Sequence, residues 1–121
     1  MIKVLKFGGT SVGSAANMKK VAEIVRREQA RITVLSAMSG TTDSLVRISR
    51  AAASGDRNAI EEQLAMLTDK YTRCIEELLR ERKQQALARM NATFGLIRDE
   101  AAAFEEYESE RKIIAQGELL T

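Results

Sequence analysis

A lysine and three glycines lie close together near the start of the sequence. Lys6 is followed by Gly8, Gly9 and Gly13, although the 121 residues contain only 7 glycines. Glycine lets the backbone approach a ligand closely, and the free amides at the start of a helix attract anions. A lysine ammonium beside such amides can stabilise the charge on a phosphoryl group during its transfer. Residues 8–14, here named the glycine turn, therefore indicate phosphate chemistry.

The glycine turn matches neither of two common phosphate fingerprints. Gly13 is followed by Ser14, whereas a P-loop has lysine at that point, and the dinucleotide fingerprint needs a third glycine that is absent. The simpler alternative is a tight turn after a strand, with Lys6 in solvent. The hydroxyl side chains of Thr10 and Ser11 favour the ligand site.

A second polar turn follows the next apolar run. Residues 36–42, here named the hydroxyl turn, have the sequence Ser-Ala-Met-Ser-Gly-Thr-Thr. The carboxyl ends of parallel strands meet at one sheet edge, where ligands of such sheets bind, so the two turns should converge. Taken alone, residues such as Ser39 and Thr42 are more often helix caps than substrate contacts.

The elements that position these turns follow from periodicity. Residues 2–7 are rich in branched and aromatic side chains and predict a strand, and residues 14–30 have apolar positions at helical spacing. Residues 31–37 contain a compact apolar run of the kind found in strands covered on both faces. Together they predict a βαβ unit with parallel strands, followed by a helix over about residues 43–53.

Two apolar stripes at steps of three and four residues dominate the rest of the chain. They predict two long helices packed as an antiparallel hairpin that fills its own core, with a turn at residues 81–84. Gly95 weakens the second helix, and residues 111–121 form a last amphipathic segment. The stripes are Ile60, Leu64, Leu67, Tyr71, Cys74 and Leu78, then Leu87, Met90, Phe94, Ile97, Ala101 and Phe104.

The expected fold class is α/β, a βαβ parallel-sheet fragment with a long antiparallel helical hairpin. We expect one domain part over residues 1–121, in which residues 1–55 form the βαβ unit and its following helix, and residues 56–121 a helical excursion. Two strands alone make a poor sheet. We therefore expect helices or a second copy of the chain to cover the strand edges, which favours a homo-oligomer.

Composition excludes several classes of function. With 19 basic and 17 acidic residues of interspersed sign, the net charge of +2 gives no support for nucleic acid as a partner. A single cysteine, Cys74, and no histidine argue against a disulfide and against a zinc site, and we expect Cys74 to pack in the core. No apolar run is long enough for a membrane span, and no secretory leader is recognisable, so we expect a cytoplasmic protein.

Three segments resemble the aspartokinases of the amino acid kinase family. Residues 6–12, Lys-Phe-Gly-Gly-Thr-Ser-Val, are similar to the opening of those proteins; residues 34–42 and residues 116–121, Gln-Gly-Glu-Leu-Leu-Thr, are similar to later segments, in the same order. The resemblance implies phosphorylation of the aspartate side-chain carboxylate with ATP and Mg²⁺. It also implies that the chain corresponds to the front portion of the kinase domain, which we do not expect to turn over by itself.

The resemblance assigns roles to particular residues. Lys6 would be catalytic, and the ATP site would comprise Lys6, Phe7, Gly8, Gly9 and Ser36. Aspartate would contact Ser39, Thr42 and Glu118, the last through the substrate ammonium. No residue is assigned as a metal ligand.

The residues themselves leave other readings open. Glu118 follows Gly117, beside which a carboxylate could approach a small cation closely, but by default it is one of 17 acidic residues on solvated helix faces. Another amino acid kinase, acting on glutamate, acetylglutamate or carbamate, is the alternative among enzymes. A helical interaction module without catalysis is the alternative of another class.

Overall fold

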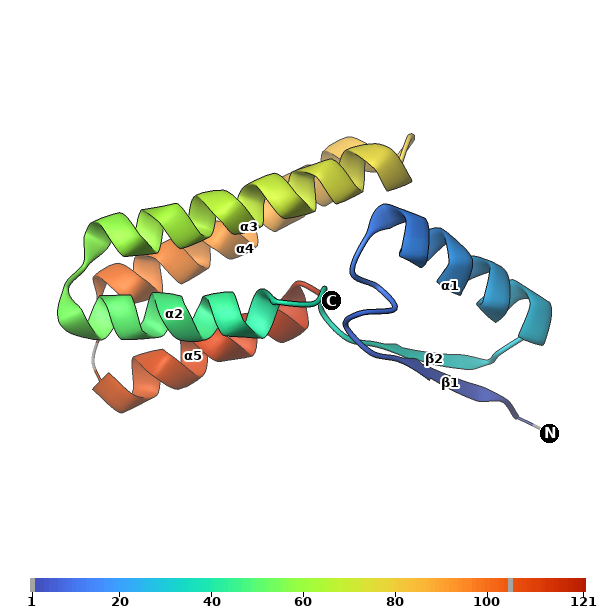
Figure 1. The fold of residues 1–121 in the computed structure, drawn as a ribbon, viewed down its shortest axis with the longest axis horizontal. Coiled ribbons are helices and arrows are strands. Elements are labelled where there is room, and N and C mark those ends of the chain that lie inside the picture. Colours follow the sequence, from blue (N-terminus) through green and yellow to red (C-terminus); the bar gives the residue numbers. More distant parts are fainter. Residues whose placement is uncertain (1, 105) are drawn as a thin grey trace.

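The computed structural model describes residues 2–104 and 106–121, which form a small parallel sheet and five helices (Figure 1). In chain order the elements are β1 (Val4–Phe7), α1 (Ala15–Glu28), β2 (Ile32–Leu35), α2 (Thr41–Ser54), α3 (Arg57–Leu78), α4 (Lys83–Ala102) and α5 (Glu106–Leu119). The expected α/β fold class is confirmed.

The predicted βαβ unit is present. β1 and β2 pair in parallel, with Lys6 opposite Val34 and Phe7 opposite Leu35. The Ser14 hydroxyl accepts a hydrogen bond of 3.1 Å from the Asn17 amide and so caps the start of α1, as the sequence predicted. The unit therefore holds the carboxyl ends of both strands at one edge of the sheet.

The sheet is less covered than the sequence predicted. Ile32, Val34 and Leu35 of β2 keep 51%, 44% and 43% of their surface exposed, so the expectation of a strand covered on both faces is wrong for the described residues. The physical reason is that α1 lies over only one side of a sheet of two strands, and that a pocket lined by Leu35 separates α1 from β2 (Figure 1). Val4 of β1 is likewise 58% exposed.

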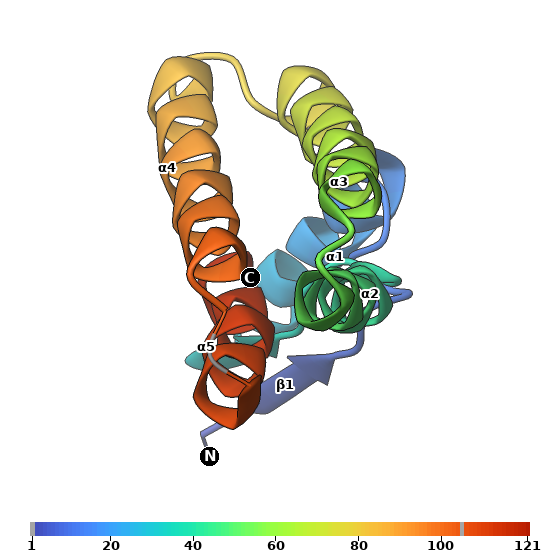
Figure 2. The ribbon, with the colours of Figure 1, turned by 90° about the vertical axis from the view of Figure 1, so that its left-hand side faces the viewer.

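The core lies among the helices. Every residue of the two predicted stripes is buried or half-buried, and α3 and α4 run antiparallel as expected. The hairpin does not fill its core alone, because Leu45 and Ile48 of α2 and Ile113 of α5 are completely buried in the same cluster. Figure 2 shows α2 and α5 below the α3–α4 pair, closing its open side.

Some boundaries differ from the sequence expectation. α2 begins at Thr41, two residues earlier than expected, because Gly40 adopts a left-handed φ of 84° and turns the chain into the helix. α4 begins at Lys83, inside the predicted turn, and continues through Gly95 without interruption. α5 also begins earlier, at Glu106. Among the described residues, none of the helices combines the length and apolar character that crossing a membrane requires.

Candidate functional site

The two turns meet at the carboxyl edge of the sheet. The Ser36 amide donates to the Phe7 carbonyl at 3.2 Å, which extends the strand ladder by one step. Beyond it, the Ser39 amide donates to the Gly9 carbonyl at 3.1 Å and so links the hydroxyl turn to the glycine turn. The predicted convergence of the turns is confirmed.

The glycines of the first turn have different tasks. A Cβ on Gly9 would lie 3.1 Å from the Ala37 carbonyl oxygen, and one on Gly13 would lie 2.9 Å from the Ser39 hydroxyl. These two glycines allow the turns to touch. Gly8 is exposed, and a Cβ there would meet nothing within 4 Å. Gly8 is therefore the glycine whose backbone a ligand can reach.

The glycine turn is fixed from inside the chain. The Thr10 carbonyl accepts hydrogen bonds from the Gly13 amide at 3.2 Å and from the Asn17 side-chain amide at 3.1 Å. Val12 is 4% exposed and anchors the turn to the apolar interior. The turn thus has a defined shape before any ligand arrives, which reduces the ordering cost of binding.

Lys6 presents its ammonium to solvent. Side chains alternate along a strand, and Val4 and Lys6 form the exposed face of β1, whereas Leu5 and Phe7 are half-buried. Register places Lys6 beside Val34, on the face opposite Leu35, which lines the apolar space under α1. Among the side chains that the structure describes, those of residues 2–104 and 111–121, no carboxylate pairs with the Lys6 ammonium. This cation is therefore available to an anionic ligand near the sheet edge.

Two adjacent threonines of the hydroxyl turn differ in exposure: Thr41 is buried and Thr42 is exposed. Thr41 is 1% exposed, and its hydroxyl shares a hydrogen bond of 2.7 Å with the Tyr71 hydroxyl. Ser39 and Thr42 are exposed. Gly40, the N-cap of α2, has no side chain to bond the first amides of the helix, so Ser39 is not the cap. Those amides and the positive end of the helix dipole favour a carboxylate ligand beside Thr42.

Glu118 lies in the last turn of α5, near the start of α2. α5 runs antiparallel to α2, so its last turn ends near the start of α2 (Figure 1). A Cβ on Gly117 would lie 3.3 Å from Leu45 Cδ1, which shows that this glycine serves the close packing of α5 on α2. The approach of Glu118 to a ligand cation stays a prediction. Glu118 itself is exposed.

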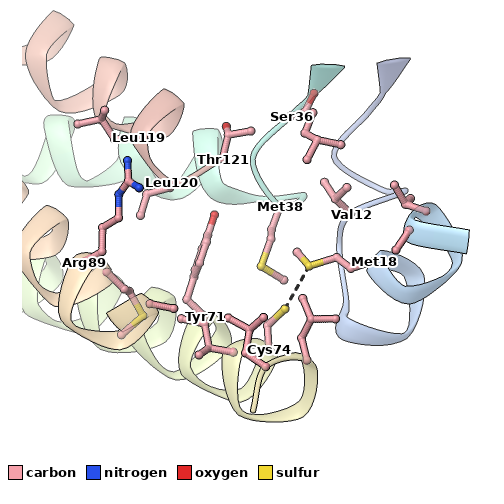
Figure 3. A pocket seen from close by; sticks show the side chains of 18 of the residues that line it. Val12, Met18, Ser36, Met38, Tyr71, Cys74, Arg89, Leu119, Leu120 and Thr121 are labelled. Carbon is pink, nitrogen blue, oxygen red and sulfur yellow. Dashed lines mark hydrogen bonds between the residues drawn. The ribbon is translucent and has the colours of Figure 1, made fainter. Parts of the chain in front are cut away.

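A pocket of about 850 Å³ lies behind the two turns (Figure 3). Its walls come from α1, β2, α3, α4 and the end of α5, and most of its lining is apolar. Ser36 and Glu118 are the predicted site residues that line it. Lys6, Phe7, Gly8, Gly9, Ser39 and Thr42 do not line it. The structure thus brings the turns together at the sheet edge and places Ser36 and Glu118 at the pocket behind them.

Sequence reasoning missed two residues that shape the site. Tyr71 was interpreted as part of an apolar stripe, and Lys70 was not singled out. The Lys70 ammonium donates to the Ser39 carbonyl, and the Tyr71 hydroxyl meets Thr41. The available hint was the polar tip of a tyrosine on a core stripe, because buried tyrosine hydroxyls usually find a partner.

Among the residues that the structure describes, no cluster of three or more Asp, Glu, Cys or His side chains that could hold a metal ion is found.

Comparison with known proteins places the fold and the turns in a family. The sequence model of the amino acid kinase family matches residues 1–119. This chain belongs to the amino acid kinase family. Its relatives include aspartokinase 1 of Arabidopsis thaliana, a chloroplastic protein that is 42% identical over 79 residues, and the aspartokinase of Chlamydia muridarum, 39% identical over 75 residues.

Two solved structures share the fold of this amino acid kinase chain. Aspartokinase III of E. coli in complex with lysine and aspartate superposes with a TM-score of 0.85 over 98% of the chain, at 25% identity. The same enzyme in complex with aspartate and ADP gives a TM-score of 0.76 at 27% identity.

The matches cover only part of each relative. The chain spans 14% of the Arabidopsis protein, 16% of the Chlamydia protein and 26% of the first E. coli structure, whereas 62% of this chain aligns with each of the first two.

Proposed function

We propose that the full-length protein carrying this sequence is an aspartate kinase, which transfers the γ-phosphoryl group of ATP to the side-chain carboxylate of aspartate. The observation that carries the proposal is the meeting of the glycine and hydroxyl turns at one sheet edge, where Lys6 is exposed near the end of β1. The likeness over nearly the whole chain to a structure that holds aspartate and ADP supports it.

On the nucleotide side, Lys6 and the glycine turn form an anion seat. The exposed backbone at Gly8 can approach phosphate oxygens, while Gly9 keeps the turn against the hydroxyl turn. The Lys6 ammonium supplies positive charge where the transferred phosphoryl group becomes most negative. Phe7 and Ser36 stand at the ends of the two strands and complete the rim through their backbone hydrogen bond.

On the acceptor side, Thr42, Ser39 and Glu118 form the proposed aspartate contacts. The exposed Thr42 hydroxyl and the uncapped amides of α2 suit a carboxylate. Glu118, on the adjoining end of α5, would attract the substrate ammonium. The substrate ammonium would thus meet an opposite charge, and a substrate carboxylate would meet hydrogen-bond donors.

The reaction needs little covalent chemistry from the protein. The aspartate carboxylate is already ionised at neutral pH, so it can attack phosphorus without a strong general base. Catalysis then depends on alignment of the reactants and on stabilisation of charge by Lys6. Mg²⁺ accompanies ATP in the proposal, and the described residues supply no step through the metal.

The same proposal includes a cytoplasmic location and self-association into a homo-oligomer. The exposed apolar residues of β1 and β2 support the need for further cover on the sheet. Residues 1–55 would carry most of the nucleotide and substrate groups, with Glu118 contributed by the helical excursion.

A substrate panel on the full-length protein tests the proposed activity. Aspartate, glutamate, acetylglutamate and carbamate are each supplied with MgATP, and ADP release is followed together with acyl phosphate trapped as a hydroxamate by hydroxylamine. We expect both signals with aspartate and neither above background with the other acceptors. ADP release with glutamate or carbamate instead would assign the protein to another branch of the family.

A further inference from the structure

We propose that Tyr71 and Lys70 of α3 are positioning residues that hold the hydroxyl turn in its binding shape. The inference rests on the proposed function for its kinetic consequence. It assigns to the helical excursion a task in substrate binding, in addition to its role in forming the core.

Tyr71 contacts the start of α2 through a buried hydroxyl. Its ring is 7% exposed, and its hydroxyl lies 2.7 Å from the hydroxyl of Thr41, which is 1% exposed. Met38, 4% exposed, lies in the same buried cluster as Tyr71 and lines the same pocket. Figure 3 shows the Tyr71 side chain reaching from α3 past Met38. The turn is therefore hydrogen-bonded to Tyr71 at position 41 and packs beside it at position 38.

Lys70, the preceding residue of α3, makes a second hydrogen bond to the turn. Its ammonium donates a hydrogen bond to the Ser39 carbonyl, between the two positions that Tyr71 contacts. Because the donor carries a charge, this bond is stronger than one between neutral groups. Two consecutive residues of one helix thus contact three residues of the turn.

These ties decide where the ligand-facing groups lie. Thr41 is anchored inward, so its neighbour Thr42 is left at the exposed start of α2. The Ser39 amide carries the constraint onward to Gly9 of the glycine turn at 3.1 Å. A shift of Tyr71 would therefore move the proposed aspartate contact first and the phosphate turn second.

Tyr71 is itself held by the second helix of the hairpin. Its ring lies edge-on to Phe94 of α4, with 5.8 Å between ring centroids and 82° between planes. Such aromatic pairs prefer this geometry. The tyrosine cannot turn away from Thr41 without disturbing the core, which makes it a rigid support.

The first experiment replaces Tyr71→Phe in the full-length protein, which removes the hydroxyl and keeps the ring against Phe94. The matched control is Thr72→Val, the next residue on α3, whose hydroxyl bonds Met90 Sδ and not the turn. For Y71F we expect KM for aspartate to rise about 5-fold, as for the loss of one hydrogen bond, with kcat changed less than about 2-fold. T72V should leave both constants unchanged.

The second experiment addresses Lys70. Lys70→Met should raise KM for aspartate about 5-fold, and Lys70→Arg, which keeps a charged donor, should recover most of the wild-type value. Lys83→Met is the control, because Lys83 makes only a 3.9 Å ion pair with Glu76 far along the hairpin. Equal effects of K70M and K83M would overturn the role assigned to Lys70.

A third measurement does not depend on catalysis. Amide hydrogen exchange in residues 38–42 should accelerate about 5-fold in Y71F, while α4 keeps its wild-type exchange. Unchanged exchange in these residues, or acceleration spread over all helices, would overturn the inference. If wild type makes no aspartyl phosphate, the proposed function fails, and the exchange result still decides the positioning role.

Discussion

The helical cluster and the sheet edge are built in opposite ways. The cluster formed by α2, α3, α4 and α5 encloses an apolar core, in which Leu45, Ile48 and Ile97 are at 0% exposure. At the sheet, Ile32 and Val4 are more than half exposed, and order comes from backbone hydrogen bonds and from the ties to α3.

The difference separates stability from chemistry. Burial of apolar surface is the main stabilising term of a fold, so the helices hold the chain together. The edge residues Lys6, Gly8 and Thr42 contribute little to burial and stay accessible to a ligand. Mutations in the helical cluster should therefore lower stability, and mutations at the sheet edge should lower activity. The following predictions test that division.

Removal of the Lys6 ammonium should have the largest effect. Lys6→Ala in the full-length protein should lower kcat on the order of 10³-fold, the loss expected for one group that stabilises the transition-state charge. The melting temperature should not change, because Lys6 is exposed. Lys3→Ala is the control, because Lys3 directly precedes β1 and its ammonium pairs with the Glu28 carboxylate at 3.0 Å. A kcat of K6A within 10-fold of wild type would contradict the role.

Removal of one core side chain should act only on stability. Ile97→Ala should lower the free energy of unfolding by about 3 kcal/mol, because it leaves a cavity in the enclosed cluster. The adjacent Leu96 is 56% exposed, and Leu96→Ala should cost less than about 0.5 kcal/mol. Chemical denaturation of both variants checks the pair. Similar losses would mean that the cluster is not the main source of stability.

The glycine turn should separate packing from ligand access. Gly9→Ala should cost about 1–2 kcal/mol, since its Cβ meets the backbone of the hydroxyl turn. Gly8→Ala should leave stability unchanged and weaken ATP binding, because its Cβ enters only open space that a ligand would use. Denaturation and calorimetric titration with ATP measure the two effects. Loss of stability in G8A with intact ATP binding would reverse the assignment.

Alkaline pH should destabilise the helical cluster, because the buried Tyr71 hydroxyl and Cys74 thiol lose their protons there. Burial raises the pKa of Tyr71 above its ordinary value of 10.0, and burial, then the nearby Glu77, raise the pKa of Cys74 above 9.0. The folded state thus favours the protonated forms. Stability should be intact below about pH 9 and fall as pH rises through the raised values. Melting curves from pH 7 to 11 should show this fall, reduced in Y71F.

A surface ion pair should have the smallest effect. Arg98 donates to both carboxylate oxygens of Glu61 at 3.0 and 3.2 Å, which holds the Glu61 pKa below its ordinary value of 4.5. The pair contributes above that pH and loses its contribution as pH falls through the lowered pKa. Because both partners are exposed, Glu61→Gln should shift the melting temperature by about 2 °C or less, as should Glu62→Gln at the exposed neighbouring position. A clearly larger shift in E61Q would show that this pair stabilises the hairpin.

The sequence predicted the element order because local rules apply to it. Local sequence is enough for three of these features, because each depends on residues only a few positions apart. They are the alternation of exposed and half-buried residues in β1, the Ser14 cap of α1, and the apolar stripes of α3 and α4. The convergence of the two turns was also predictable, since parallel strands share one carboxyl edge. The roles of Lys6, Ser36, Thr42 and Glu118 came from resemblance and stay predictions.

What the sequence could not supply was the partner of each side chain across the fold. The glycines, Lys6 and the periodic apolar stripes are visible in the sequence by itself, and they indicate the family. Only the tertiary structure showed that the Tyr71 hydroxyl bonds the hydroxyl of Thr41, 30 positions away. It also showed that Gly117 packs closely against Leu45, and that apolar residues of β2 are exposed. Periodicity fixes which face of an element is apolar, whereas the packing of several elements together selects the neighbour that the face meets.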